Sequence, residues 1–241
     1  MPQSPHRIFA AVDTTDLTTA RALARALAGH VGGLKLGLEF FVAHGPQGIN
    51  TVMDGTGVPL FLDLKLHDIP NTVAGGVRAA VAVKPAFLTI HTGGGRAMMK
   101  AAADEATDAA AKAGVQRPRI LGVTILTSMD QGDLASVGVD GSVLDQVKRL
   151  VALARESGLD GVVCSPWEVT ALRSVVGPDF VLMVPGIRPA GAAGGDQKRV
   201  MTPAEAIGAG ASYLVIGRPI TQADNPAQAA EAIAAEMGDK T

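Results

Sequence analysis

The stretch FLDLKLHDIPNT (61–72) begins as a buried strand and yet carries Asp63, Lys65 and Asp68 within six residues. Charged groups are rarely buried unless they are paired. Side chains alternate along a strand, so the three leucines share one face while the charged side chains at 63 and 65 share the other. This pattern predicts a strand that packs on helices with one face and supplies a polar site with the other.

Similar apolar runs, rich in Val, Ile and Leu, recur along the whole chain and are separated by Ala- and Leu-rich stretches of helical type. Strands that alternate with helices predict parallel β-α-β units, because parallel neighbours need a crossover connection. The expected strands are 7–13, 32–38, 59–66, 86–92, 119–126, 161–166, 180–186 and 213–219, and the clearest helices are 16–29, 95–114, 142–158 and 225–238.

Eight such units in 241 residues predict a (β/α)₈ TIM barrel, whose typical length is ~250 residues. A doubly wound α/β sheet is the rival architecture. No composition break divides the chain, so we expect one domain over residues 1–241 with a ragged start at 1–6. The hydrophobic fraction of 47% is enough for a full core.

Composition also narrows the function classes. The net charge of −2 and the lack of a basic cluster argue against partners such as nucleic acid or an anionic membrane surface. Cys164 is the only cysteine, which excludes an internal disulfide and fits a reducing compartment. The first apolar run ends at Asp13, too short for a signal peptide, and no run approaches a membrane span. We therefore expect a cytoplasmic protein.

Charged residues gather at the ends of the first three expected strands. Asp13 ends the first strand, Lys35 lies in the second, and Asp63 and Lys65 lie in the third. Barrel enzymes hold their active sites at the carboxyl ends of the strands. A structural ion-pair network is the alternative, but burying ions costs several kcal/mol each, and apolar groups often stabilise a fold as well. The placement therefore favours a functional site.

Lys65 lies between two acids, Asp63 and Asp68, which favour its protonated form. A lysine that forms a Schiff base must instead lose its proton near neutral pH. We therefore expect Lys65 to act as an ammonium acid and electrostatic stabiliser.

A phosphate site is expected where strands seven and eight end, in residues 185–203 and 216–219. Glycine lets backbone N–H groups approach an anion, and an arginine can bind it with two hydrogen bonds, which fits Gly217 and Arg218. The glycines from Gly186 onward suggest a lid. The alternative is an ordinary surface loop that carries an arginine.

Other reactive residue types are expected to be structural. His67 and His91 are interpreted as structural histidines, and Cys164 as a small buried hydrophobe. Met98 and Met99 are interpreted as core residues. No metal site is expected, because no two plausible ligands recur at helical i, i+4 spacing.

DLKLHDIPNT (63–72) resembles the signature of the orotidine 5′-phosphate decarboxylase family, with Leu66 where phenylalanine is common. The exchange lies on the face expected to meet the helices. The resemblance covers nearly the whole chain, through AVD (11–13), LKLG (34–37), GVTILTS (122–128), PGIRP (185–189), Gln197 with the following KR, and IGRP (216–219).

This resemblance implies decarboxylation of orotidine 5′-phosphate to UMP, the last step of pyrimidine synthesis, without cofactor or metal. Lys65 would stabilise the carbanion that CO₂ leaves behind and then protonate that ring carbon. Asp63 would lie beside the departing carboxylate, and Lys35 and Asp68 would complete an alternating array of charges.

The resemblance also implies the binding residues and a homodimer in which Asp68 and Thr72 reach the neighbouring subunit's site. Asp13 and Lys35 would hold ribose hydroxyls, and Thr127 would lie by the pyrimidine. The remaining substrate-binding residues implied are Asp63, Ile69, Pro70, Arg188 in the lid-side loop, and Gln197, Gly217 and Arg218 for the phosphate.

Two other functions stay open at this point. A metal-dependent sugar-phosphate decarboxylase or aldolase-type barrel shares the Asp-x-Lys-x-x-Asp spacing, but it would have a metal-binding carboxylate in place of Lys35. A non-catalytic barrel that binds a phosphometabolite would need the phosphate site but not Lys65 between two acids.

Overall fold

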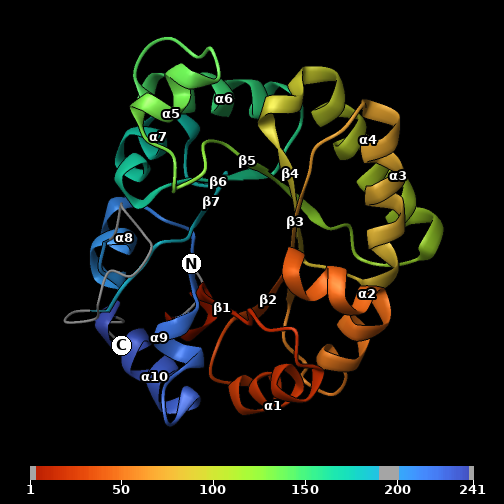
Figure 1. Ribbon diagram of the computed structural model, residues 1–241, viewed down its shortest axis with the longest axis vertical. Helices are drawn as coiled ribbons and strands as arrows, with labels where there is room; N and C mark the ends of the chain where they lie inside the picture. Colours follow the sequence, from red (N-terminus) through yellow and green to blue (C-terminus); the bar gives the residue numbers. More distant parts are fainter. Residues whose placement is uncertain (1–3, 190–200, 239–241) are drawn as a thin grey trace.

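The computed structural model describes residues 4–189 and 201–238. Within these residues eight parallel strands close into a barrel, each paired with the next and the last with the first (Figure 1). The prediction of a (β/α)₈ barrel is therefore confirmed, and a doubly wound sheet is excluded. The strands are β1 (Ile8–Ala11), β2 (Gly33–Gly37), β3 (Leu60–Leu66), β4 (Phe87–His91), β5 (Arg119–Val123), β6 (Gly161–Val163), β7 (Val181–Val184) and β8 (Tyr213–Ile216).

Helices form a ring outside the strands, as Figure 1 shows. None of those in the described part of the chain combines the length and apolar character that a membrane crossing requires. The α-helices are α1 (Leu17–Leu27), α2 (Leu38–Met53), α3 (Pro70–Ala80), α4 (Gly95–Ala113), α5 (Gln131–Ser136), α6 (Val143–Glu156), α7 (Val169–Val176), α8 (Pro203–Ala209), α9 (Arg218–Thr221) and α10 (Pro226–Glu236), and the short 3₁₀ helices are η1 (Ser4–Arg7), η2 (Val81–Val83), η3 (Thr92–Gly94) and η4 (Pro166–Glu168).

Side-chain caps explain where several helices begin. Asp16 accepts a hydrogen bond from the Thr19 amide at 2.6 Å, and Ser142 and Asn225 cap α6 and α10 in the same way. Such caps satisfy amides that have no partner inside the helix. The helices therefore start within a residue or two of the positions expected from sequence.

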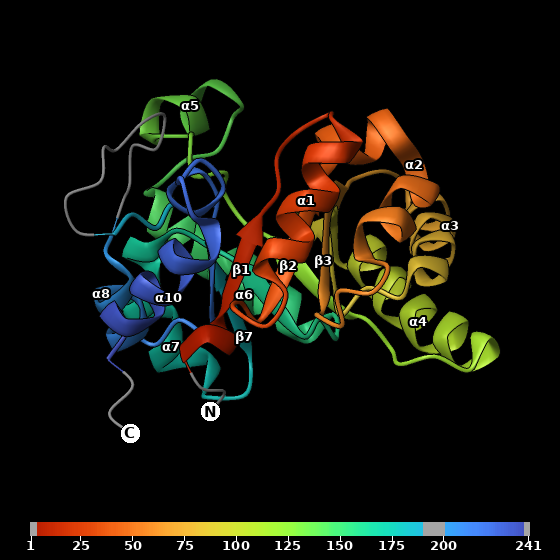
Figure 2. The same cartoon turned by 90° about the horizontal axis from the view of Figure 1, so that it is seen from below.

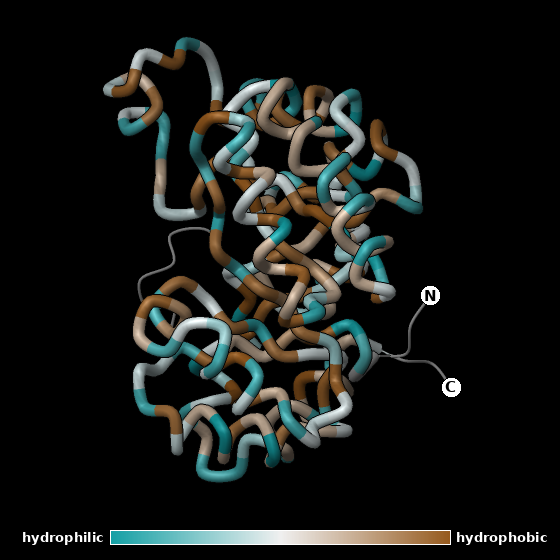
Figure 3. Tube along the Cα trace, turned by 90° about the vertical axis from the view of Figure 1, so that its right-hand side faces the viewer, coloured by the Kyte–Doolittle hydropathy of each residue, from teal (hydrophilic) through white to brown (hydrophobic). Residues whose placement is uncertain are grey.

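The core has two layers, one on each side of the strands. Leucines such as Leu34 and Leu62 face outward and pack under the helices. Inside the barrel, the rings of Phe9, Phe87 and Tyr213 meet edge to face with centroids 5.4 to 5.6 Å apart. Figure 3 colours stretches of the chain in the middle of the molecule as hydrophobic. These rings fill the interior, so a site must open at an end of the barrel rather than run through it.

Strand β3 departs from the regular alternation expected from sequence. Its pairing with β4 joins Leu62 to Leu88 but then joins Leu66 to Ile90, so extra β3 residues bulge between these pairs. Lys65 lies in the bulge with a φ of 51°. The leucines of β3 nevertheless face the helices as predicted, because Leu64 and Leu66 pack against the outer core.

Candidate active site

The charged residues gather at the carboxyl ends of the first three strands. In Figure 2 the β1 arrow points to the end of the barrel where α5 lies. The strand register places Ala11 of β1 beside Lys35, and Gly37 of β2 beside Asp63. The sequence prediction that Asp13, Lys35 and the charged part of β3 meet at one mouth is therefore confirmed.

Lys35 is the more deeply buried lysine of the mouth. It is only 7% exposed, and its ammonium donates a hydrogen bond to a carboxylate oxygen of Asp13. A side chain at Gly37 would begin 3.1 Å from the Lys35 Nζ, so glycine at this position leaves room for the ion pair. Burial of a paired charge is tolerated because its partner replaces part of the lost hydration.

Lys65 forms the second ion pair, with Asp63 of the same strand. The distance from Lys65 Nζ to Asp63 Oδ2 is 2.7 Å. The Lys65 side chain is 37% exposed and that of Asp63 is 15% exposed, so this pair borders the open mouth more than Lys35 does. The Lys65 ammonium is therefore accessible to a substrate that enters the mouth.

The backbone of Lys65 has an unusual conformation for a residue with a side chain. At φ 51° it lies in the left-handed region, which costs an L-residue about 1–2 kcal/mol. Strained conformations persist where the surrounding structure holds them, and they cluster at functional sites. Sequence alternation could not reveal this feature, because the bulge results from the pairing with β4.

Thr89 of β4 holds this conformation, and sequence reasoning missed it. Its Oγ1 accepts a hydrogen bond from the Lys65 amide at 2.9 Å and donates one to Asp63 Oδ1 at 2.9 Å. Thr89 alternates with Phe87, whose ring lies inside the barrel, so the spacing along β4 could have placed its hydroxyl there.

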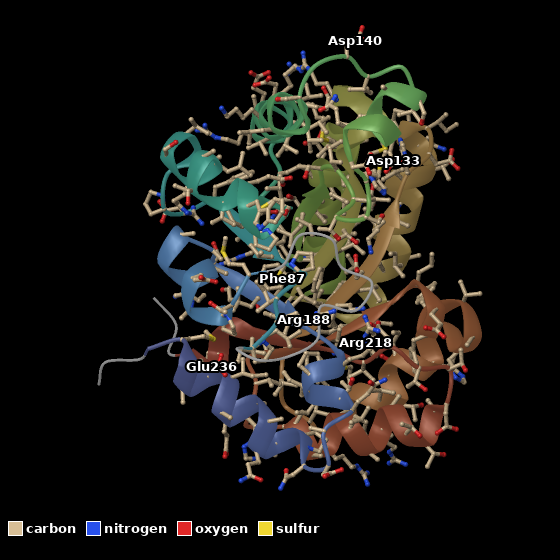
Figure 4. The ribbon with its side chains drawn as sticks, turned by 60° about the vertical axis from the view of Figure 1, so that its left-hand side comes forward. Phe87, Asp133, Asp140, Arg188, Arg218 and Glu236 are labelled. Carbon is tan, nitrogen blue, oxygen red and sulfur yellow. The ribbon has the colours of Figure 1, made fainter. Side chains whose placement is uncertain are left out.

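A cavity of about 410 Å³ opens beside the two ion pairs. Its lining includes Asp13, Lys35 and Asp63, together with Arg188 and Arg218. Figure 4 shows the two arginines, which come from the chain after β7 and from the start of α9 after β8. The cavity therefore combines three cationic side chains with two carboxylates.

Gly217, the glycine predicted to let the backbone approach an anion, directly follows the end of β8. It lines the same cavity, and a side chain there would begin 3.5 Å from Ala11 and 3.9 Å from Asp13 Oδ2. Its backbone therefore lies close to the Asp13 carboxylate at the cavity wall. Gln197, the other predicted phosphate ligand, falls outside the described residues, as do Gly191, Gly194 and Gly195 of the expected lid.

A smaller cavity of about 60 Å³ adjoins Lys65. Thr127 lines it, together with apolar groups that include Val123, Val163 and Cys164. The structure therefore brings Thr127 to Lys65, as expected for a residue beside the substrate ring. The apolar walls lower the local polarity and strengthen electrostatic interactions near the ammonium.

Residues 68–72, the second half of the DLKLHDIPNT stretch, do not line either cavity. Asp68, Pro70 and Thr72 are exposed, and Ile69 is 66% exposed. The Asp68 carboxylate accepts a hydrogen bond from the Ile69 amide at 2.6 Å. The structure thus separates these four predicted site residues from the charged groups of their own mouth.

Two histidines border the site. The rings of His67 and His91 lie 5.2 Å apart. Burial lowers the pKa of His91, and the neighbouring His67 and Lys65 lower it further. Both effects favour the neutral form of the His91 ring.

The remaining sequence interpretations concern buried residues and metals. Cys164, Met98 and Met99 are buried, as predicted. Across residues 4–189 and 201–238, no group of three or more His, Cys, Asp or Glu side chains is arranged to hold a metal ion.

Fold and mouth together define a class, the (β/α)₈-barrel enzymes with lysine–aspartate pairs on the first strands and arginines after the last two. The family model described as orotidine 5′-phosphate decarboxylase / HUMPS family matches residues 6–233. The chain belongs to this family.

Individual relatives point to one branch of the family. The chain is 56% identical to the orotidine 5′-phosphate decarboxylase of Paramagnetospirillum magneticum, over 96% of this chain and 98% of that protein. It is 54% identical to that of Rhodospirillum rubrum, over 98% and 95%. The crystal structure of orotidine 5′-phosphate decarboxylase from Lactobacillus acidophilus superposes with a TM-score of 0.84 at 37% identity, covering 96% of this chain and 98% of that one.

Proposed function

We propose that the protein converts orotidine 5′-phosphate to UMP and CO₂, with Lys65 as the group that stabilises and then protonates the reacting carbon. The chain is a carboxy-lyase of the orotidine 5′-phosphate decarboxylase type. The observation that carries the role of Lys65 is its ion pair with Asp63, 2.7 Å long, at the mouth. The cytoplasm is the proposed compartment.

The proposed reaction breaks the bond between the pyrimidine ring and its carboxylate, and the bonding electrons stay on the ring carbon. Lys65, as an ammonium, offsets the negative charge that develops there. Asp63 lies beside the departing carboxylate, and the repulsion between the two anions disappears as CO₂ leaves. Lys65 then donates a proton to the ring carbon, which gives UMP.

Binding energy for this reaction comes from groups away from the reacting bond. Arg188, Gly217 and Arg218 line the 410 Å³ cavity and suit a phosphate dianion, and Gln197 is proposed to join them. Asp13 and Lys35 line the same cavity and are proposed to hold the ribose hydroxyls. A phosphate held at a distance can drive closure over the reacting group.

Lys35 argues against the metal-dependent sugar-phosphate alternatives. The family name covers more than one activity. Those alternatives need a metal-binding carboxylate where this chain has Lys35, whose ammonium is already paired with Asp13. We propose catalysis without metal or organic cofactor, because the two lysines supply the positive charge.

Asp68 and Thr72 are proposed to complete the site of a second subunit. Both are exposed at the start of α3, outside the cavities of their own chain. Leu38 and Val42 of the neighbouring helix α2 are 59% and 76% exposed, as is typical of a surface that another protein covers. A two-fold homodimer would cover such a surface and exchange Asp68 between the two sites.

Direct measurement of UMP formation from orotidine 5′-phosphate tests the proposed function. Wild-type protein dialysed against EDTA is expected to keep its turnover, and Lys65→Ala is expected to lose it while still binding UMP. The ammonium interacts mainly with charge that exists only during the reaction, so product binding survives. Magnesium-dependent turnover, or Lys65→Ala activity within tenfold of wild type, would refute the mechanism.

A further inference from the structure

Thr89 is fully buried in β4, and its single hydroxyl serves both members of the Lys65–Asp63 pair. It accepts the Lys65 backbone N–H and donates to Asp63 Oδ1, while Asp63 Oδ2 accepts from Lys65 Nζ. The three hydrogen bonds form a closed ring that runs from the Lys65 backbone through Thr89 and Asp63 to the Lys65 ammonium.

The hydroxyl also replaces a bond that the sheet lacks at this point. The pairing of β3 with β4 is interrupted between Leu62 and Leu66, and Lys65 lies inside the interruption. Its amide donates to the Thr89 hydroxyl, and a buried amide without an acceptor would be costly. Thr89 therefore stabilises the left-handed backbone from which the Lys65 side chain departs.

Loss of the Thr89 hydroxyl would affect both the backbone amide and the side-chain ammonium of Lys65. The Lys65 amide would lose its acceptor, and one Asp63 oxygen would lose a donor in a site where Asp63 is 15% exposed. The carboxylate would then be free to turn, and the direction of the ammonium would change with it. A shift of about 1 Å in a catalytic group can cost 10²-fold in rate.

We propose that Thr89 is a positioning residue, which holds the Lys65 ammonium and the Asp63 carboxylate in the arrangement that decarboxylation requires. The inference rests on the proposed role of Lys65 in the reaction. It does not require Thr89 to contact the substrate.

Thr89→Val is the main test, because valine keeps the branched shape of threonine and replaces the hydroxyl with a methyl group. We expect kcat to fall by about 10- to 100-fold while KM stays within about twofold, because the phosphate and ribose contacts are untouched. Thr89→Ser keeps the hydroxyl and is expected to retain kcat within about threefold. Thr89→Ala takes the place of Thr89→Val if the latter does not fold.

Thr92→Val provides a matched control. Thr92 is also fully buried, and its hydroxyl donates to the Val123 carbonyl at 2.8 Å rather than to Lys65 or Asp63. This variant loses an equivalent buried hydrogen bond and is expected to keep its kcat within about twofold. Equal kcat losses in the valine variants at 89 and 92, an unchanged kcat in Thr89→Val, or a Thr89→Ser as impaired as Thr89→Val would each overturn the proposal.

A crystal structure of Thr89→Val separates this proposal from the proposed function. Positioning by Thr89 predicts that Lys65 leaves its φ near 51° or that its Nζ moves beyond hydrogen-bond distance of Asp63 Oδ2. If both features persist, the positioning role is wrong even when the wild type decarboxylates orotidine 5′-phosphate. If the wild type shows no turnover, the proposed function fails, whatever this structure shows.

Discussion

The left-handed backbone conformation of Lys65 is expected to lower the free energy of unfolding, and a pair of substitutions measures this effect. The perturbation is Lys65→Gly compared with Lys65→Ala. Both variants remove the ammonium and its ion pair with Asp63, so that loss cancels in the comparison. What differs is the tolerance of each residue for a φ of 51°.

The expected difference follows from the backbone conformation. A left-handed conformation costs alanine about 1–2 kcal/mol, whereas glycine adopts it freely. Glycine loses about 0.5–1 kcal/mol more than alanine in backbone entropy on folding. The balance favours Lys65→Gly by about 0.5–1 kcal/mol in the free energy of unfolding. For a domain of this size it raises Tm by about 1–4 °C over Lys65→Ala.

Urea denaturation followed by circular dichroism, together with calorimetric Tm values, provides the measurement. Lys84 supplies a matched control, because it also has a φ of 51°, is exposed and follows η2 far from the mouth. Lys84→Gly is likewise expected to be more stable than Lys84→Ala. If alanine is favoured over glycine at position 65 but not at 84, β3 does not hold Lys65 in the left-handed conformation, and the reasoning is refuted.

Three further predictions concern binding, assembly and pH. Arg218→Ala should raise KM by about 10- to 100-fold through loss of charged hydrogen bonds to phosphate, and an unchanged kcat/KM would place the phosphate elsewhere. Lys65→Ala and Asp68→Ala proteins that are refolded together should recover about a quarter of wild-type activity, because about half of randomly paired dimers are mixed and each mixed dimer has one intact site of two. If heterodimers form, as verified by mass, and are inactive, Asp68 acts within its own subunit. Burial lowers the pKa of His91 in the folded protein below its ordinary 6.5. As the pH falls, His91 therefore becomes protonated in the unfolded chain before it does in the folded protein, and the free energy of unfolding decreases below about pH 6.5. His91→Asn should therefore lose less stability between pH 7 and pH 5 in urea titrations, and an equal loss would contradict this.

The sequence by itself determined the barrel and most of the charged mouth. Eight apolar runs that alternate with helical stretches leave few arrangements other than parallel β-α-β units, because hydrophobic periodicity and short crossovers are local properties. Asp13, Asp63 and Lys65 could be assigned to one end because they lie toward the carboxyl ends of their runs, and Lys35 joins them from within the neighbouring run. The order of elements alone brings such ends together in a closed barrel.

Only the tertiary structure decided how these groups are paired and aimed. Lys35 pairs with Asp13, which follows a neighbouring strand, whereas Lys65 pairs with Asp63 of its own strand, and this partition of the two lysines follows from their three-dimensional arrangement. The bulge in β3 and the role of Thr89 depend on the register with β4, which no local pattern encodes, because the paired residues are 24 to 26 positions apart in the chain. Alternation predicts which face a side chain occupies, but its direction at a bulge is set by the partner strand.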